Sequence, residues 1–286
     1  MIIDFHVHSS ASDGTFAPSD LVAKASDRRF AAIALTDHDN CDGVREFLES
    51  ASSSSLRKIP AIELSIDPGE TFHRFHLLGL GIDPENSTLK AFLKKILDGR
   101  NARNKRILGN FAKLGIEIAE DDIASYAHGD VLARPHFGRW LMNHGYVKTI
   151  KEAFDKYLAD DAPKATSCYE DRFHPDQEEA FSVIHGAGGL CVMAHPKYWR
   201  SYWKETAPEY ADAEKGLAEL REKGLDGLET LYQANTQGEN VEFTRIANKL
   251  GLLKSAGSDF HGANKPTIPL GMEVSESFIA PLLERL

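Results

Sequence analysis

Ile2-Ile3-Asp4-Phe5-His6-Val7-His8 is the segment on which the interpretation of this chain depends. Its β-branched and aromatic residues predict a buried strand. Side chains two apart in a strand lie on one face, so His6 and His8 can bind one ion together, and Asp4 on the same face can support them. A His-X-His pair arises easily by chance, so the prediction needs support from the rest of the chain.

Strand and helix patterns alternate outward from this segment. Further strands are predicted over 31–36, 59–66, 72–82, 190–194, 228–232 and 252–256. Helices are predicted from Pro18 onward and over 42–51, 174–187, 209–223 and 238–250. Strands spaced by helices predict a mostly parallel sheet, open or closed as a barrel, whose working face lies at the carboxyl ends of the strands.

The middle of the chain has almost no strand signal. Helices are predicted there over 87–114, 120–128, 134–143 and 150–157, the first ended by Gly115. We therefore expect three consecutive parts: residues 1–83 as the first part of the α/β fold, 84–164 as a helical insert that acts as a lid or substrate domain, and 165–286 as the second part.

The composition is that of an ordinary globular protein. The chain has 286 residues, a formal net charge of −10, 42% hydrophobic and 27% charged residues, which excludes a disordered chain, a fibrous repeat and a disulfide miniprotein. No apolar run approaches the ~20 residues of a membrane helix, and no signal peptide is visible. The three cysteines, an odd number and far apart, are expected to be reduced thiols in a cytoplasmic protein: Cys41, Cys168 and Cys191.

The acidic charge argues mildly against wholesale nucleic-acid binding. It does not argue against a small phosphorylated ligand, because an acidic protein can hold cations that attract phosphate. No obligate protein partner and no membrane association are predicted from the sequence.

Six histidines and three carboxylates fall at or near the ends of six predicted strands. They are His6, His8, Asp13, His38, Glu63, His76, His195, Asp259 and His261. Any one of them could be a turn residue or a satisfied core histidine, but nine such groups converging at strand ends require cations to neutralise them. Imidazole and carboxylate suit zinc, manganese or iron, and the absence of cysteine ligands argues against a closed structural zinc site. Nine ligands predict two or three divalent ions.

The order of these motifs resembles the PHP (polymerase and histidinol phosphatase) family of metal-dependent phosphoesterases. The resemblance covers essentially the whole chain and is carried by Asp4-Phe-His6-Val-His8, Thr36-Asp37-His38, Glu63, His76, Ala194-His195-Pro196 and Gly257-Ser-Asp259-Phe-His261-Gly262, with Arg134-Pro135-His136-Phe137 and Gly227-Leu228-Glu229 in addition. It implies an α/β fold, a distorted (βα)7 TIM-like barrel carrying a helical insert.

The resemblance also implies a trinuclear site. His6, His8, Glu63 and Asp259 would bind the first metal, Asp13, His38 and His261 the second, and Glu63, His76 and His195 the third, which makes Glu63 a bridge. Some relatives have a histidine at the position of Asp13. A carboxylate is a harder ligand than an imidazole, so manganese or iron can also bind at that site.

Within the family, Asp13, the insert and the Arg-Pro-His segment look like the bacterial nucleotide and oligoribonucleotide phosphoesterases. The expected activity is hydrolysis of nucleotides (5′-monophosphates or 3′,5′-bisphosphates) or short oligoribonucleotides by a metal-activated hydroxide held by Glu63, Asp13, His38 and Asp259. One alternative is a small-molecule phosphomonoesterase such as histidinol-phosphate phosphatase. Another is a non-catalytic, metal-binding accessory domain, which metal-dependent release of phosphate from p-nitrophenyl phosphate would exclude.

Candidates for binding the substrate phosphate are Arg134, His136 and Arg103. Arg103 belongs to a basic stretch that either guides a polyanion such as a short RNA or forms a solvated helix face, the commoner case: Lys94, Lys95, Arg100, Arg103, Lys105 and Arg106. Several aromatic residues could stack on a base or simply pack: Tyr126, Tyr169, Tyr198, Trp199, Tyr202, Trp203 and Tyr232. The run 197–203 is expected to be a loop that borders the metal site.

Overall fold

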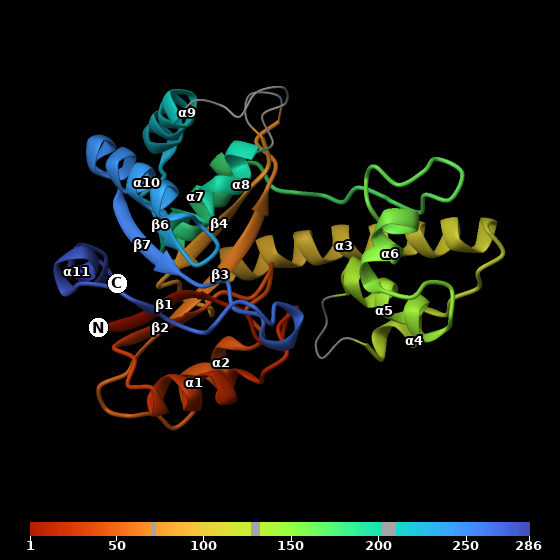
Figure 1. Ribbon diagram of the computed structural model, residues 1–286, viewed down its shortest axis with the longest axis horizontal. Helices are drawn as coiled ribbons and strands as arrows, with labels where there is room; N and C mark the ends of the chain where they lie inside the picture. The colour runs from red at the N-terminus through yellow and green to blue at the C-terminus, as the bar shows by residue number, and fades with distance from the viewer. Residues whose placement is uncertain (70–72, 127–131, 202–209) are drawn as a thin grey trace. The chain divides into compact units, whose positions relative to one another are not determined.

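The computed structural model describes residues 1–69, 73–126, 132–201 and 210–286. These residues form two compact units, one made of residues 1–93 and 175–286 and the other of residues 94–174 (Figure 1). The second unit begins and ends about ten residues later than the insert boundaries expected from the sequence, because the long helix that enters it starts within the first unit.

The first unit is an eight-stranded, nearly closed barrel. Its strands are β1 (Ile2–Val7), β2 (Ala32–Leu35), β3 (Arg57–Ile66), β4 (Phe75–Leu80), β5 (Leu190–Met193), β6 (Gly227–Tyr232), β7 (Leu253–Gly257) and β8 (Met272–Glu273). They are hydrogen-bonded in the order β7-β6-β5-β4-β3-β2-β1-β8. A parallel bridge between Val7 and Phe260 joins the end of β1 to the segment that follows β7, which confirms the expected barrel.

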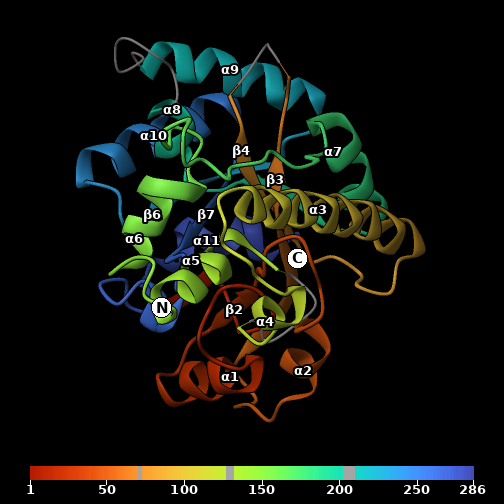
Figure 2. The same cartoon turned by 90° about the vertical axis from the view of Figure 1, so that its right-hand side faces the viewer.

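The strand directions differ from the expectation at one strand. β1, β2 and β3 pair in parallel, as do β5, β6 and β7, but β4 is antiparallel to both β3 and β5. β3 and β4 lie side by side in Figure 2. The connection between Ile66 and Phe75 is too short for a parallel crossover, so the chain must turn back on itself there. The start of the predicted strand, Phe72, lies outside the described residues.

Helices cover the outside of the barrel. They are α1 (Pro18–Asp27), α2 (Val44–Glu49), α7 (Gln177–Gly186), α8 (Pro196–Ser201), α9 (Tyr210–Lys223), α10 (Gln237–Leu250) and α11 (Glu276–Leu283). One apolar cluster joins Ile3 and Phe5 to Leu78, Val192 and residues of α11, and a second joins β1 and β2 to α1 and α2. The strands are therefore fixed in place by apolar packing, which leaves their ends free to carry polar groups.

The second unit is entirely helical in its described residues. Its elements are α3 (Ser87–Lys113, which starts in the first unit), α4 (Glu120–Ala124), α5 (Arg134–Asn143), α6 (Ile150–Ala153) and a π-helical turn (Phe154–Leu158). Ile107 and Phe111 of α3 pack against Phe137 and Leu141 of α5 in a core of their own. α4 ends before the predicted helix over 120–128 does, and residues 127–128 lie outside the described chain.

Three elements were not expected from the sequence. α8 occupies the first part of the run predicted to be a loop, whereas Tyr202 and Trp203 lie outside the described residues. Pro196 occupies the first position of α8, where a proline loses no hydrogen bond, so the proline begins a helix there. β8 and α11 complete the barrel near the C-terminus. Among the described helices, none is both long and apolar enough to cross a membrane.

Candidate metal centre

The nine predicted ligands come together around Glu63, a fully buried carboxylate on β3. Its Oε1 lies 3.3 Å from His6 Nε2, 2.9 Å from His76 Nδ1 and 3.1 Å from His195 Nε2. Its Oε2 lies 3.1 Å from both His8 Nε2 and His38 Nδ1. One carboxylate therefore contacts five imidazoles that the sequence places on β1, β2, β4 and β5 or just after them.

Asp13, Asp259 and His261 complete the cluster on the side of His8. His261 Nε2 lies 3.2 Å from Asp13 Oδ1, and Asp259 Oδ1 lies 3.4 Å from His8 Nε2. Within this cluster, four sets of side chains each bring donor atoms within 4.8 Å of one another: His8, Asp13, His38 and His261; His6, Glu63 and His195; His6, His8 and Asp259; and His38, Glu63 and His76. The sets overlap, and Glu63, which has two oxygens, belongs to two of them, so neighbouring ions would share this carboxylate.

Several buried donor atoms of this cluster have no hydrogen-bond partner in the described structure. They are His6 Nε2, His8 Nδ1, His8 Nε2, His38 Nδ1 and Glu63 Oε2. Buried polar atoms are normally paired, and a set of unpaired ring nitrogens pointing at carboxylates is the arrangement that a cation completes. Nitrogen and oxygen donors without cysteine suit divalent metal ions. The residues present therefore fit the metals that the sequence predicts.

The electrostatics of the cluster favour cations. Burial alone lowers the pKa of His6 and His8, but the carboxylates of Glu63, Asp259 and their neighbours outweigh it, raising the pKa of His8 to about 9 and that of His6 well above its usual value. Burial alone raises the pKa of Glu63 and Asp259, but the surrounding imidazoles hold both well below the usual range. The carboxylates are thus ionised and draw positive charge to the site.

His38 behaves differently from His6 and His8. Burial lowers the pKa of His38 more than the carboxylates of Glu63 and Asp13 raise it, and the positive charges of His8 and His76 act with burial, so that the pKa falls to about 3. Its ring is therefore neutral at pH 7 and offers a nitrogen lone pair, which is the form that a metal ion binds.

Two buried aspartates accept hydrogen bonds from loops around the cluster. Asp4, expected to support its neighbours, accepts hydrogen bonds from the amide and hydroxyl of Ser258 and from the amide of Gly271, which fixes the segment leading to Asp259. Burial raises the pKa of Asp4 to about 6. Asp37 accepts from the amide and hydroxyl of Ser9 and from the hydroxyl of Ser12, next to Asp13.

The outer oxygen of Asp259 has partners that the sequence did not reveal. Tyr232 donates its hydroxyl to Asp259 Oδ2 at 3.0 Å, and Lys265 Nζ lies 2.6 Å from the same oxygen. Burial, together with the charge of Asp259, raises the pKa of Tyr232. Asp259 Oδ1 is left to face His6 and His8, so this carboxylate is oriented with one oxygen toward the cluster.

The backbone is strained at the same place. Four described residues other than glycine have a positive φ, and two of them are predicted ligands: His195 at 28° and Asp259 at 60°. A third, Asp39 at 55°, follows the ligand His38. Such conformations cost energy and concentrate at functional sites, where the surrounding structure enforces them.

The predicted phosphate-binding residues lie in the second unit. Arg103 is 3% exposed and has no hydrogen-bond acceptor among the described residues. Burial, together with the positive charges of Arg100, Arg134 and Arg172, lowers its pKa to about 9. Arg134 donates to the carbonyl of Leu158 and lies over the ring of Tyr169. The unit therefore holds a group of mutually repelling arginines, of which Arg103 and Arg100 are buried and Arg134 and Arg172 are half-buried.

His136 has a structural contact as well. Its Nδ1 accepts a hydrogen bond from the amide of Ala133 at the start of α5, which leaves the ring proton on Nε2. The rest of the basic stretch on α3 is largely occupied within the unit, since Lys94 pairs with Asp98, Arg106 pairs with Glu170, and Lys95 lies over Phe173. This part of the stretch forms a salt-bridged helix face.

Of the aromatic candidates that the structure describes, two lie at the predicted metal cluster. Tyr198 contacts the ring of His195 at 5.2 Å between centroids, and Tyr232 contacts the same ring at 5.7 Å. Trp199 is buried. Tyr126 lies in the second unit, where its hydroxyl accepts a hydrogen bond from Asn143.

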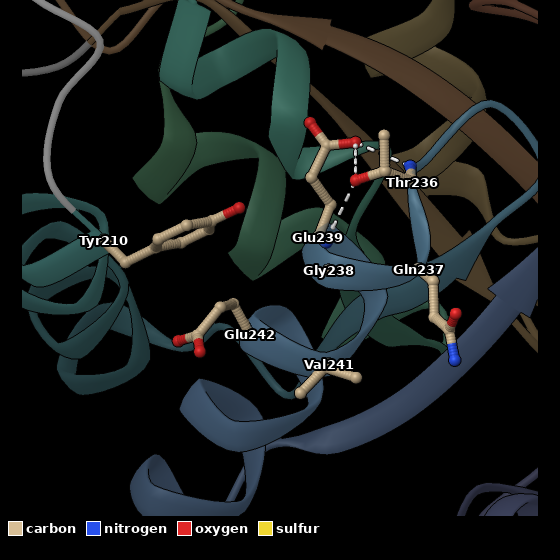
Figure 3. A pocket seen from close by; sticks show the side chains of 7 residues that line it. All are labelled: Tyr210, Thr236, Gln237, Gly238, Glu239, Val241 and Glu242. Atoms are coloured by element: carbon tan, nitrogen blue, oxygen red, sulfur yellow. Dashed lines mark hydrogen bonds between the residues drawn. The ribbon is translucent and has the colours of Figure 1, made fainter.

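Two other features lie outside the cluster. A shallow pocket of about 480 Å³ between α9 and α10 is lined by Tyr210, Thr236, Gln237, Gly238, Glu239, Val241 and Glu242, none of them a predicted ligand (Figure 3). His185, Cys191 and Asp226 also lie close together, but Asp226 already accepts from the ring of His185 and the amide of Cys191, so hydrogen bonds account for this group.

Comparison with known proteins agrees with the geometry. The PHP domain profile matches residues 4–223. The chain is 32% identical over 260 residues to a 3′,5′-nucleoside bisphosphate phosphatase of Chromobacterium violaceum, covering 91% of this chain and 87% of that protein. It is 30% identical over 279 residues to the 5′-3′ exoribonuclease Rnm of Salmonella typhimurium, covering 96% and 89%.

A solved structure agrees as well. A metal-dependent phosphoesterase from Bifidobacterium adolescentis superposes with a TM-score of 0.81 at 26% identity, covering 99% of this chain and 96% of that one. The profile match includes the barrel strands β1–β5 with seven of the nine clustered ligands. The ligand cluster, the barrel and these similarities agree: the chain belongs to the PHP domain family.

Proposed function

We propose that this chain is a metal-dependent phosphoesterase that hydrolyses nucleotides, as 5′-monophosphates or 3′,5′-bisphosphates, or short oligoribonucleotides. The observation that carries the proposal is the gathering of six histidines and three carboxylates, Glu63 among them, in one cluster, with unpaired donor atoms buried in it. The names of the bisphosphate phosphatase and of the exoribonuclease support the nucleotide class of substrate.

The nine clustered residues would hold two or three ions of manganese, iron or zinc. The sharing of Glu63 between the His195 and His76 groups supports more than one ion. The imidazole-rich donor set favours these metals over magnesium, which prefers oxygen ligands. Bound there, the ions would supply an activated water and neutralise charge on the phosphate.

The chain's own side chains indicate where substrate enters. His6, His8 and Glu63 are fully buried, whereas the side chains of Asp13, His38 and His76 are 30%, 20% and 36% exposed. A phosphate group therefore reaches the cluster from the side of Asp13, His38 and His76. Glu63, Asp13, His38 and Asp259 would hold the metal-activated hydroxide, and they would keep it and the phosphorus that it attacks on this open side.

The insert would bind a phosphate of the substrate through its arginines. Arg103 is a buried guanidinium without an acceptor and with positive neighbours, and an anion relieves both the missing hydrogen bonds and the repulsion. Arg134, whose second terminal nitrogen is not used by the contact with Leu158, and His136 would contribute further contacts to the phosphate. The lid or substrate role expected for the insert rests on this group.

Release of phosphate from a substrate panel tests the proposal. Metal-stripped protein is assayed with nucleoside monophosphates, 3′,5′-bisphosphates, short RNA and p-nitrophenyl phosphate, each with added Mn²⁺, Zn²⁺ or a chelator. We expect turnover that requires metal and is fastest with a nucleotide. No metal-dependent release from any substrate would contradict the phosphoesterase assignment, while release from p-nitrophenyl phosphate alone would contradict only the nucleotide class. Arg134→Ala is expected to reduce kcat/KM while the metal content stays unchanged.

A further inference from the structure

Glu229 is a carboxylate at the metal centre that is not one of the nine clustered ligands. It lies on β6, is fully buried, and uses both oxygens. Oε1 accepts a hydrogen bond from His6 Nδ1 at 3.0 Å, and Oε2 accepts one from the backbone amide of His195 at 2.6 Å. One side chain thus connects the first ligand of the chain to the strained backbone of another.

The neighbouring strand leaves space for this carboxylate. A Cβ added to Gly257 on β7 would lie 2.4 Å from Glu229 Oε1 and 2.4 Å from His6 Cβ. Any residue other than glycine would therefore push the carboxylate or the imidazole out of position. Glycine at position 257 is therefore needed for Glu229 and His6 to keep their positions.

We propose that Glu229 is a positioning residue that fixes which ring nitrogen of His6 faces the metal. This proposal rests on the metal centre proposed above. A carboxylate can only accept, so Nδ1 keeps its proton, and the lone pair available for a cation is that of Nε2. Nε2 lies 3.3 Å from Glu63 Oε1 and 3.6 Å from Asp259 Oδ1, and it has no hydrogen-bond partner in the described structure. A cation would bind the lone pair of Nε2, while Glu229 holds the proton on Nδ1 in place.

Replacing Glu229 with glutamine distinguishes a role in positioning His6 from a role in filling space. The glutamine amide has the size of the carboxylate, but its oxygen only accepts hydrogen bonds and its NH₂ group only donates them. The amide of His195 requires the accepting oxygen, so the NH₂ group faces His6 Nδ1 and donates to it. The His6 proton must then sit on Nε2, where it blocks the metal. The reversed amide would place two donors against each other at the 2.6 Å contact with His195.

Asp37→Asn is the matched control. Asp37 is also buried next to the cluster, but its partners include the hydroxyls of Ser9 and Ser12, which can rotate to accept as well as donate. An amide there finds a complementary partner for each end. The control therefore introduces the same chemical change without forcing a proton onto a ligand.

The experiment measures Zn²⁺ affinity by competition with a chelating indicator, in the metal-stripped full chain and in Glu229→Gln, Glu229→Ala and Asp37→Asn. We expect Glu229→Gln to bind zinc about 10- to 100-fold more weakly than the wild type, the range for partners of ligand histidines. Glu229→Ala should bind more tightly than Glu229→Gln, because an unrestrained His6 can adopt either tautomer. Asp37→Asn should stay within about threefold of the wild type, because its partners can exchange donor and acceptor roles.

A space-filling role gives the opposite order, with Glu229→Gln near the wild type and Glu229→Ala weaker, and that order overturns the proposal. Failure of the wild type to bind zinc would overturn the metal centre itself, which is a different result. A second measurement does not depend on the folding of the variants: histidine-labelled, zinc-loaded wild type should show an ¹H–¹⁵N signal from a protonated Nδ1 of His6. A proton found on Nε2 instead would overturn the proposal.

Discussion

Glu63 connects more of the metal centre than any histidine does. Its oxygens contact the rings of His6, His8, His38, His76 and His195. Glu63→Gln keeps the size of the side chain but removes the charge that neutralises the bound cations and places an NH₂ group against the rings. We expect metal content to fall and turnover to drop by more than about 100-fold, the upper range for partners one step removed from a metal.

Metal analysis by mass spectrometry after dialysis, together with circular dichroism of the same sample, checks this prediction. The barrel strands pack through apolar residues away from Glu63, so the spectrum should match that of the wild type. A folded Glu63→Gln protein with a full complement of metal would contradict the bridging role.

Arg103 should affect stability and binding in opposite directions. A buried guanidinium without an acceptor destabilises the anion-free protein, so Arg103→Met should raise its free energy of unfolding by about 1–3 kcal/mol. The same change removes a charged contact to substrate phosphate, and kcat/KM should fall roughly 10- to 150-fold. Thermal melting with and without inorganic phosphate measures both effects, because phosphate should stabilise the wild type and not the variant. An Arg103→Met protein that phosphate stabilises as strongly as the wild type would contradict the anion site.

Residues of the site could be predicted from sequence where their signal is local. His6 and His8 follow from strand periodicity, and the other ligands from their places at strand ends. The roles of Glu229, Tyr232 and Lys265 could not be predicted in this way. Glu229 acts on His6, 223 residues away, and only the closure of the barrel brings β7 next to β1, so that Glu229 of β6 reaches His6 past Gly257. The available signals were a single carboxylate inside a buried strand and the Gly227-Leu228-Glu229 segment of the family resemblance.

Helix α8 is held in place at its first turn. Lys197 Nζ donates to the carbonyl of Ala234 at 2.6 Å and lies 3.2 Å from Glu239 Oε2, which also caps α10 at Thr236 (Figure 3). Lys197→Met keeps the apolar stem and removes both polar contacts, which are partly buried. We expect a loss of about 1–2 kcal/mol in the free energy of unfolding.

Thermal melting of Lys197→Met measures this loss, which corresponds to a fall of about 2–8 °C in Tm for a chain of this size. Lys151→Met is the control, because Lys151 pairs with Asp155 in an exposed i, i+4 contact on α6 that contributes at most about 0.5 kcal/mol. Equal effects of the two substitutions would show that Lys197 is an ordinary surface lysine.

Helices and strands could be predicted from the sequence where the hydrophobic periodicity agrees with the residues that typically begin or end such an element. The helix over Arg134–Asn143 matches the sequence prediction at both ends, because Pro135 lies at its start and the apolar spacing is regular. α8 was missed because a proline directly after a ligand histidine suggests a loop. α11 was missed because Pro281 lies inside it, although so near its end that few helical hydrogen bonds are lost. The direction of β4 followed from a short connection rather than from any residue type.

For the whole molecule, metal should stabilise the fold as well as support turnover. Ligands from β1 to β7 meet in one cluster, so an ion that binds only the folded barrel stabilises all of it. At a metal concentration 100 times Kd this amounts to about 2.7 kcal/mol. Chelation should lower Tm by about 5–10 °C for a chain of this size. Mn²⁺ or Zn²⁺ should restore it and Mg²⁺ should not, and a Tm unaffected by chelator would contradict ligation by the cluster.

Substrate choice also belongs to the whole molecule, because a metal cluster alone hydrolyses many phosphomonoesters and selectivity must come from its surroundings. The insert supplies a group of arginines around Arg103. Histidinol phosphate carries a cationic amine that these arginines repel, whereas a nucleotide with a second phosphate offers them an anion. We therefore expect nucleoside 3′,5′-bisphosphates to exceed histidinol phosphate in kcat/KM by tenfold or more, about 1.4 kcal/mol.

Side-by-side kinetics in Mn²⁺ and in Zn²⁺, with wild type and Arg103→Met, decide between these substrate classes. If the arginines cause the preference, Arg103→Met should slow the bisphosphate and leave histidinol phosphate unchanged or faster, because removing a positive charge relieves the repulsion of its amine. The ratio of kcat/KM for the bisphosphate to kcat/KM for histidinol phosphate should therefore fall. An equal or reversed preference in the wild type would contradict the nucleotide class and leave the metal-dependent phosphoesterase in place. A preference that Arg103→Met does not change would locate selectivity in the barrel, where Tyr198 and Tyr232 contact His195.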